Sequence, residues 1–278
     1  MTPHAPLAVA RDGARDGVAV TADPVAVRVR ALDLWYGDFQ ALRGVSCDLP
    51  ARGVTALIGP SGCGKSTLLR CLNRMNDLVP GARVRGTIRI HDLDVLAPGA
   101  DLEAVRRRVG MVFQRPNPFP LSVAEDLGCG PRVHGALRRA RDAREAREAL
   151  VERVLRAVGL WDALADRLDD DALALSPEQQ QRLCIARMLA TEPEVLLFDE
   201  PCSALDPIAT ARIEELMREL AERYTVVVVT HSMQQARRVG DTAAFMLLGE
   251  LVEQGECAAL FEDPRDRRTA DYVAGRFG

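Results

Sequence analysis

Two stretches in the first third of the chain show features of strands with one buried face. In the first, apolar side chains alternate with charged ones: Val25, Val27 and Val29 against Arg28 and Arg30. The second covers residues 87–90. We therefore predict an antiparallel β region in this part of the chain.

Three short segments are instead continuously apolar, at residues 54–58, 195–198 and 225–229. Strands that are buried on both faces have this pattern. A stretch of helical character at residues 209–223 separates the last two segments. Alternation of buried strands with helices predicts a parallel sheet flanked by helices, and hence an α/β fold.

Residues 137–158 have the spacing of an amphipathic helix. Its apolar face consists of Leu150, Val151, Val154, Leu155 and Val158. Most of the arginine and glutamate side chains fall on the opposite face, which we interpret as a solvated helix surface.

The segment at residues 115–120, called the connector below, contains three prolines. Proline lacks a backbone N–H group and restricts the residue before it. We therefore predict an irregular segment on the protein surface.

Composition narrows the class of protein. The 278 residues are 47% hydrophobic and 27% charged, which is typical of a globular protein with one large core or two small ones. A net charge of −4 and a pI near 5.7 argue against a free-standing nucleic-acid-binding protein. No apolar run has membrane-spanning length, so membrane association would require a partner.

Cysteine usage and the N-terminal composition indicate the cellular compartment. The seven cysteines are scattered without a C-x-x-C pair, which favours reduced thiols in a cytoplasmic protein over disulfides or a zinc site. Residues 1–24 lack the basic start and apolar block of a signal peptide. We predict a flexible tail at residues 1–24 and a folded domain at residues 25–278.

A single lysine, Lys65, occurs among 36 lysine and arginine residues. It lies in a segment, called the phosphate loop below, that fits the pattern G-x-x-x-x-G-K-[ST]: Gly59, Pro60, Ser61, Gly62, Cys63, Gly64, Lys65, Ser66 and Thr67. In this pattern glycines let backbone N–H groups surround a phosphate chain, Lys65 reaches the β- and γ-phosphates, and the Ser66 hydroxyl binds Mg²⁺. The structural alternative is a glycine-rich turn, but the predicted strand before it and helix after it favour nucleotide binding.

Two carboxylates, Asp199 and Glu200, follow the strand predicted at residues 195–198. Ligands bind at this edge of an open parallel sheet. We expect Asp199 to hold Mg²⁺ through its water shell, and Glu200 to orient and partly deprotonate the attacking water. An acidic pair at a strand end is also a common turn feature, but its combination with Lys65 favours catalysis.

Three further side chains could complete a nucleotide site. His231 is separated from the strand predicted at residues 225–229 by one residue, and a neutral imidazole there could donate to a γ-phosphate oxygen. Gln114 precedes the connector, and its amide could contact Mg²⁺ or the lytic water. Tyr36 could stack on adenine, although an isolated aromatic residue more often belongs to the core.

Together these residues resemble the nucleotide-binding subunit of ATP-binding-cassette (ABC) transporters over residues 25–278. The resemblance implies a P-loop NTPase fold with a RecA-like parallel-sheet core, an antiparallel β subdomain and a helical subdomain at about residues 115–190. It assigns Tyr36 to adenine stacking, the phosphate loop to Walker A, Gln114 to the Q-loop, residues 195–200 to Walker B, residues 203–206 with Asp206 to the D-loop and His231 to the switch histidine.

The same resemblance implies partners and cofactors. ABC subunits form head-to-tail dimers that enclose two ATP molecules with Mg²⁺, and the signature of one subunit closes on the ATP of the other. The dimer could be a homodimer or a heterodimer with another ABC ATPase.

Longer strings are similar to the ATPase subunit of the bacterial phosphate importer, at residues 59–65, 113–120, 179–187, 201–210 and 272–278. This similarity implies an ATPase that powers uptake of inorganic phosphate from the cytoplasmic face of the cell membrane. It would bind membrane-spanning permease subunits through the groove near Gln114 and the connector. A separate periplasmic or extracellular substrate-binding protein would select the cargo, so the cargo is implied by the resemblance alone.

The signature of the family is normally Leu-Ser-Gly-Gly-Gln, whereas here it consists of Leu175, Ser176, Pro177, Glu178 and Gln179. The replacement favours a helix start, with Ser176 as N-cap, Pro177 at the first helical position and Gln179 completing a capping box. As a γ-phosphate clamp it is weaker, because Pro177 has no N–H and Glu178 brings negative charge toward a polyanion.

The changed signature leaves two interpretations open. Either Ser176 and the helix N-terminus suffice and hydrolysis is slower, or the chain is a weakly hydrolysing regulatory subunit that pairs with a homologue carrying an intact signature. A third possibility is a soluble ABC ATPase that acts on nucleic acid or ribosomes. The single cassette and the acidic pI argue against it.

Overall fold

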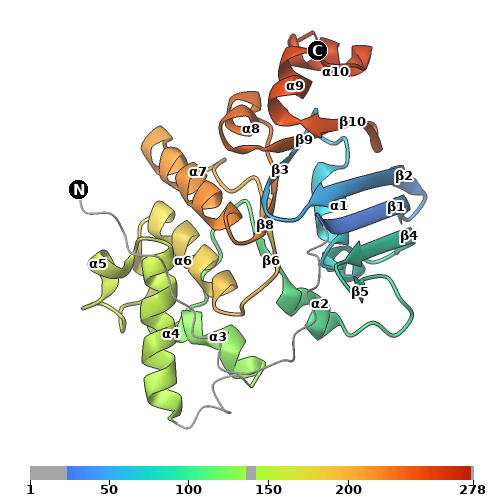
Figure 1. Cartoon of the computed structure of the whole chain (residues 1–278). Coiled ribbons are helices and arrows are strands. Elements are labelled where there is room, and N and C mark those ends of the chain that lie inside the picture. The colour runs from blue at the N-terminus through green and yellow to red at the C-terminus, as the bar shows by residue number, and fades with distance from the viewer. Residues whose placement is uncertain (1–23, 136–141, 277–278) are drawn as a thin grey trace.

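The computed structural model describes residues 24–135 and 142–276, which form a four-stranded sheet, a six-stranded sheet and helices around them (Figure 1). Of the predicted tail at residues 1–24, only Pro24 belongs to the described residues. Within the described part of the chain, no helix combines the length and apolar character that crossing a membrane requires.

The four-stranded sheet is antiparallel, as its alternating sequence predicts. Its strand order is β2-β1-β4-β5. The strands are β1 (Val25–Tyr36), β2 (Phe39–Pro50), β4 (Ala82–Ile90) and β5 (Leu93–Asp94). Gly37, with φ of +59°, lies in the tight turn between β1 and β2, where a left-handed backbone favours glycine.

The six-stranded sheet has the order β10-β9-β3-β8-β7-β6. Its strands are β3 (Gly53–Ile58), β6 (Val109–Val112), β7 (Val195–Asp199), β8 (Thr225–Val229), β9 (Thr242–Leu247) and β10 (Glu250–Glu256). Every neighbouring pair is parallel except β9 and β10. The three continuously apolar segments of the sequence are β3, β7 and β8, so the predicted parallel sheet is confirmed.

Helices connect the strands and cover the sheets (Figure 1). The α-helices are α1 (Lys65–Cys71), α2 (Leu102–Arg108), α3 (Val123–Val133), α4 (Ala143–Ala157), α5 (Trp161–Leu164), α6 (Pro177–Leu189), α7 (Pro207–Ala221), α8 (Met233–Val239), α9 (Cys257–Glu262) and α10 (Arg267–Val273). Two 3₁₀ helices are η1 (Met75–Leu78) and η3 (Ala172–Ala174).

The helix predicted at residues 137–158 corresponds to α4, which begins later because the Asp142 side chain caps its first N–H groups. Residues 137–141 of that prediction lie outside the described residues. The helix predicted at residues 209–223 is α7, and the connector is irregular, as its prolines require. The helical subdomain at about residues 115–190 stays a prediction.

Side-chain alternation along the parallel strands produces two cores. Leu57 and Leu197 face the four-stranded sheet and α1, whereas their neighbours Ile58 and Phe198 face the helices on the other side. Both faces of the six-stranded sheet are therefore buried, which explains its continuously apolar strands.

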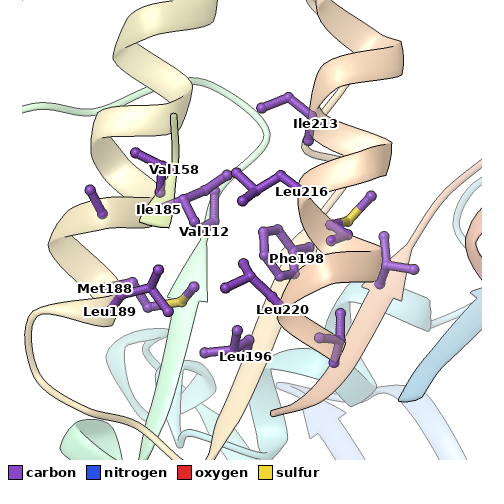
Figure 2. Packing of buried hydrophobic residues seen from close by; sticks show 14 of the residues in the cluster. Val112, Val158, Ile185, Met188, Leu189, Leu196, Phe198, Ile213, Leu216 and Leu220 are labelled. Carbon is purple, nitrogen blue, oxygen red and sulfur yellow. The ribbon is translucent and has the colours of Figure 1, made fainter. Parts of the chain in front are cut away.

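The helical face of the sheet is closely packed at β7. Figure 2 shows Leu216 and Leu220 of α7 around Phe198, with Ile185 and Leu189 reaching in from α6. This packing fixes the position of Asp199, the last residue of β7, and of Glu200 directly after it.

Candidate functional site

The phosphate loop joins β3 to α1 in a backbone conformation that only glycine adopts readily. Gly59, Gly62 and Gly64 have φ values of +145°, +76° and +107°. A Cβ atom on Gly59 would lie 2.2 Å from the carbonyl oxygen of Met246, and one on Gly64 would lie 3.0 Å from that of Ala41. The loop geometry therefore depends on glycine at these positions.

Lys65 folds back over the loop and is buried, with 5% of its surface exposed. Its Nζ donates to the carbonyl oxygens of Gly59 at 2.8 Å and Pro60 at 2.9 Å. Burial raises the pKa of the adjacent Cys63 thiol, and the Lys65 ammonium opposes this shift. The thiol stays protonated, so Cys63 places no negative charge beside the Lys65 ammonium.

Ser66 and Asp199, which sequence reasoning assigned to Mg²⁺, meet at the C-terminal edge of the sheet. The Ser66 hydroxyl donates to Asp199 Oδ1 at 2.6 Å. Arg70 NH2 donates to Asp199 Oδ2 at 2.9 Å. The Asp199 carboxylate is buried, so both of its oxygens are held in fixed positions.

These oxygen donors fit Mg²⁺, which takes one or two carboxylates and completes its shell with water and nucleotide phosphates. Among the described residues there is no group of three or more His, Cys, Asp or Glu side chains placed to hold a metal ion. Ser66 and Asp199 supply two protein oxygen ligands, and a nucleotide and water could complete the shell of a Mg²⁺ ion held there.

Gln114, Glu200 and His231 converge on one atom. Gln114 Nε2 donates to Glu200 Oε2 at 3.4 Å, and His231 Nδ1 lies 3.3 Å from the same oxygen. Glu200 has a φ of +50°, and its N–H donates to the Val229 carbonyl at 3.0 Å. A left-handed conformation is uncommon for glutamate, but Glu192, outside this site, has a φ of +52° as well, so the role of Glu200 is inferred from its contacts.

Tyr36 lies at the end of β1 and is partly buried against the core. Its hydroxyl donates to Asn76 Oδ1 at 2.7 Å, and Asn76 Nδ2 donates to the Thr67 carbonyl at 2.9 Å. These bonds connect Tyr36 to the helix that follows the phosphate loop. Adenine stacking by Tyr36 stays a prediction.

The signature segment, residues 175–179, begins α6 as predicted. Ser176 and Gln179 form a capping box, and Pro177 occupies the first turn of the helix. Glu178, which we expected to bring negative charge toward a polyanion, has two basic partners within the chain. Its carboxylate lies 2.9 Å from Arg182 NH1 and 3.7 Å from Arg212 NH1, so its charge is compensated within the chain.

Asp206 caps the next helix, because its carboxylate accepts from the N–H groups of Ile208 and Ala209, both at 2.9 Å. The Arg212 contact thus joins the start of α6 to α7. These contacts connect the signature segment to α6 and α7, not to the phosphate loop of its own chain.

Residues 42–203, more than half of the chain, match the family described as ABC transporter. The chain belongs to this family. The chain is a nucleotide-binding subunit of the ABC ATPase type with the P-loop NTPase fold, so the predicted fold class is confirmed.

Solved structures of ABC ATPases are similar to the chain. One is cbiO1 from Clostridium perfringens, part of the cbiONQ ABC transporter complex, with a TM-score of 0.74, 27% identity and coverage of 91% of this chain and 97% of that chain. A bacterial Atm1-family ABC exporter with ATP bound has a TM-score of 0.71 and 27% identity, and the match covers 94% of this chain and 43% of the exporter chain. An ATP-binding cassette in a dimeric post-hydrolysis state with ADP and Pi has a TM-score of 0.70 and 27% identity, and the match covers 83% of this chain and 98% of that cassette.

Sequence reasoning missed several side chains that hold this ABC site together. Arg70 lies one helical turn after Ser66, a spacing that could have indicated a shared partner. Gln181 is buried, and its Nε2 donates to the carbonyls of Phe113 at 3.2 Å and Pro201 at 3.0 Å. It therefore ties α6 to the residue before Gln114 and the residue after Glu200. Three consecutive glutamines, at residues 179–181, gave no signal for which one is buried.

Proposed function

We propose that this chain is the ATP-hydrolysing subunit of an ABC importer that takes up inorganic phosphate. The observation that supports hydrolysis is the convergence of Gln114 and His231 on the Glu200 carboxylate, beside the pair of Ser66 and Asp199. The cargo is supported by the similarity of the longer sequence strings to the phosphate-importer ATPase.

In this proposal ATP binds to the phosphate loop with Mg²⁺, and Tyr36 stacks on its adenine. Ser66, Asp199 and Gln114 would hold the ion, which neutralises charge on the phosphates. Lys65, whose ammonium now bonds to the loop carbonyls, exchanges these partners for the β- and γ-phosphates. The remaining donors are backbone N–H groups of the loop.

Hydrolysis would use three side chains at one point. Glu200 orients water and accepts its proton, which makes the water a stronger nucleophile. His231 donates to a γ-phosphate oxygen. Gln114, whose Nε2 contacts the same Glu200 oxygen as His231, would present its amide oxygen to Mg²⁺ or to the attacking water. The fixed backbone of Glu200, bonded to Val229, keeps its carboxylate at the sheet edge.

A second subunit would complete the site. Ser176, Pro177, Glu178, Gln179 and Asp206 would face the ATP of the partner in a homodimer or a heterodimer. The dimeric post-hydrolysis structure of an ATP-binding cassette with ADP and Pi supports this arrangement.

We further propose that permease subunits dock beside Gln114 and the connector, which would place the chain at the cytoplasmic face of the membrane. Phe119 is 45% exposed although Arg187 lies 4.4 Å from its ring centroid. Nearby in the fold, a cleft of about 870 Å³ between α2, α3 and α4 is lined by Arg107, His134 and Arg153, among others. An exposed aromatic ring and a cleft lined by both polar and apolar side chains suit contact with a partner. The substrate-binding protein would act indirectly, through the permease.

Uptake of radiolabelled phosphate tests this function. Cells that lack the chain should lose ATP-dependent phosphate uptake, the wild-type chain should restore it, and Glu200→Gln should not. Sulfate uptake, measured in parallel, should stay unchanged. Loss of another solute's uptake with normal phosphate uptake would contradict the cargo and leave the importer role intact.

A weakly hydrolysing regulatory subunit is the second candidate, and Pro177 favours it because it supplies no N–H to a partner's γ-phosphate. The negative charge of Glu178 supports this candidate less, because Arg182 and Arg212 compensate it. ATPase assays of the chain alone and with a homologous subunit distinguish the two candidates.

A further inference from the structure

The C-terminal helix α10 lies against the strand beside the phosphate loop. The Tyr272 ring stacks on Phe245 of β9, with centroids 4.8 Å apart and ring planes at 24°. Phe245 pairs with Ile58, the last residue of β3 before the loop. The end of the chain is thereby placed next to the first residue of the nucleotide site.

Tyr272 also contacts that first residue directly. Burial raises the pKa of the Tyr272 hydroxyl, and a hydrogen bond with the Gly59 backbone opposes the shift. A contact that favours the ionised hydroxyl requires a donor, which identifies the Gly59 N–H. The Gly59 carbonyl accepts from Lys65 Nζ at 2.8 Å, so Gly59 is held on one side by Tyr272 and on the other by Lys65.

Gly59 depends on contacts with other groups to hold its conformation, because glycine has more backbone freedom than any other residue. Its φ of +145° is accessible mainly to glycine, and the Met246 carbonyl oxygen would lie 2.2 Å from a Cβ atom there, so no other residue can take its place. Helix α10 is itself anchored at its start, because the Glu253 carboxylate accepts from the N–H groups of Arg265 at 2.9 Å and Asp266 at 3.1 Å. Tyr272 thus extends from an anchored helix to a flexible residue of the phosphate loop.

We propose that Tyr272 is a positioning residue for ATP binding: its hydroxyl holds Gly59 in the conformation that lets the phosphate loop and Lys65 receive the phosphates. Tyr272 itself does not touch the nucleotide. The inference rests on the proposed ATP-binding function of the loop. It makes the C-terminal helix a support of the nucleotide site, and not only a cover of β9.

The test is Tyr272→Phe in the full-length chain, because phenylalanine keeps the ring on Phe245 and removes only the hydroxyl. We expect the Kd for a fluorescent ATP analogue and the KM for ATP to rise about three- to tenfold, as expected for one lost hydrogen bond. Maximal turnover at saturating ATP should stay within about twofold, since the catalytic side chains are unchanged. Tyr224→Phe is the matched control, because Tyr224 packs against the same core but directly precedes β8, at the edge of the sheet opposite the phosphate loop, and it should leave both constants unchanged.

Hydrogen exchange provides a second measurement that does not depend on turnover. The Gly59 amide should exchange faster in Tyr272→Phe than in the wild-type chain or in Tyr224→Phe. An unchanged Kd with a lower melting temperature would show a purely structural role and overturn the proposal. A wild-type chain that binds no ATP would contradict the proposed function itself, whereas a wild-type chain that binds ATP no better than Tyr272→Phe would contradict only the role of Tyr272.

Discussion

The phosphate loop and the signature segment each begin a helix, but they use the start of the helix differently. The loop enters α1 through Gly64, with a φ of +107°, and within the described residues this helix has no side-chain cap and no acidic residue in its first turn. The signature segment enters α6 through Ser176 and Gln179, which cap the helix, and the carboxylate of Glu178 is paired with Arg182.

The difference shows that the N–H groups at a helix start serve either the protein itself or a ligand. In α1 the glycines leave these donors to a phosphate, and the helix gains no capping energy. In α6 side chains satisfy the donors and stabilise the helix by about 0.5–2 kcal/mol. The signature segment thus favours local stability, whereas α1 starts without a side-chain cap among the described residues.

The first expected effect concerns ATP binding, on which hydrolysis and dimerisation both depend. Lys65→Ala should weaken ATP binding by about a hundredfold or more, because hydrogen bonds to charged groups contribute about 1.5–3 kcal/mol each and Lys65 would serve two phosphates. Lys65→Arg should not restore binding, since a planar guanidinium does not fit the space between the Gly59 and Pro60 carbonyls.

Equilibrium binding of a fluorescent ATP analogue measures this effect. Arg144→Ala is the control, because Arg144 is 89% exposed on α4 and its loss should leave the affinity unchanged. Wild-type affinity in both Lys65 variants would show that the phosphate loop does not bind the nucleotide. The start of α1 would then not serve a ligand, and the difference from the signature segment would have no functional meaning.

The next effect separates hydrolysis from binding. Glu200→Gln should lower maximal turnover by about a hundredfold to ten-thousandfold, the usual contribution of a general base, while ATP affinity stays within a few-fold. The amide keeps the shape of the side chain near Gln114 and His231. Steady-state hydrolysis and nucleotide binding are measured on the same preparation, with Glu148→Gln on α4 as the control. Normal turnover would exclude Glu200 as the base.

Glu200→Gln also separates closure of the dimer from hydrolysis. Without hydrolysis, ATP-dependent dimerisation reports only on how well the signature segment closes over bound nucleotide.

Local patterns predicted much of the fold and the phosphate site. The continuous apolar runs identified β3, β7 and β8, and the edge of a parallel sheet placed Asp199, Glu200 and His231 together. These predictions succeed because strand periodicity and the loop motif depend on residues that are adjacent in sequence.

The contacts that come from distant elements could not be predicted in this way. Arg212 reaches Glu178 from α7, and Tyr272 reaches the phosphate loop from the end of the chain. The contact between Glu178 and Arg212 could not be predicted from the sequence. The position of α7 relative to α6 is set by the packing around Phe198 (Figure 2). The shorter contact of Glu178, with Arg182, has the local i,i+4 spacing of a helix, whereas the contact with Arg212 depends on the tertiary structure.

The smallest expected effect tests the signature segment itself. Replacing Pro177 and Glu178 together by glycine should raise ATPase activity or ATP-driven dimerisation by about three- to tenfold, because it returns one N–H donor to a partner's γ-phosphate. The same variant should be less stable by about 1–3 kcal/mol, since it removes the proline from the helix start and breaks the partly buried pair with Arg182. ATPase assays, dimerisation by light scattering and thermal unfolding measure the two opposite changes.

The single variants assign each change to one residue. Pro177→Gly should carry the gain in activity, whereas Glu178→Gln should leave activity unchanged and lower the melting temperature, because the Glu178 charge is already compensated by Arg182 and Arg212. A gain in activity for Glu178→Gln equal to that for Pro177→Gly would show that the two arginines do not shield the nucleotide from this carboxylate. If the double variant hydrolyses ATP no faster and dimerises no better, Ser176 and the helix N-terminus already suffice as the clamp, and the signature segment is a tolerated variant of an ordinary importer ATPase.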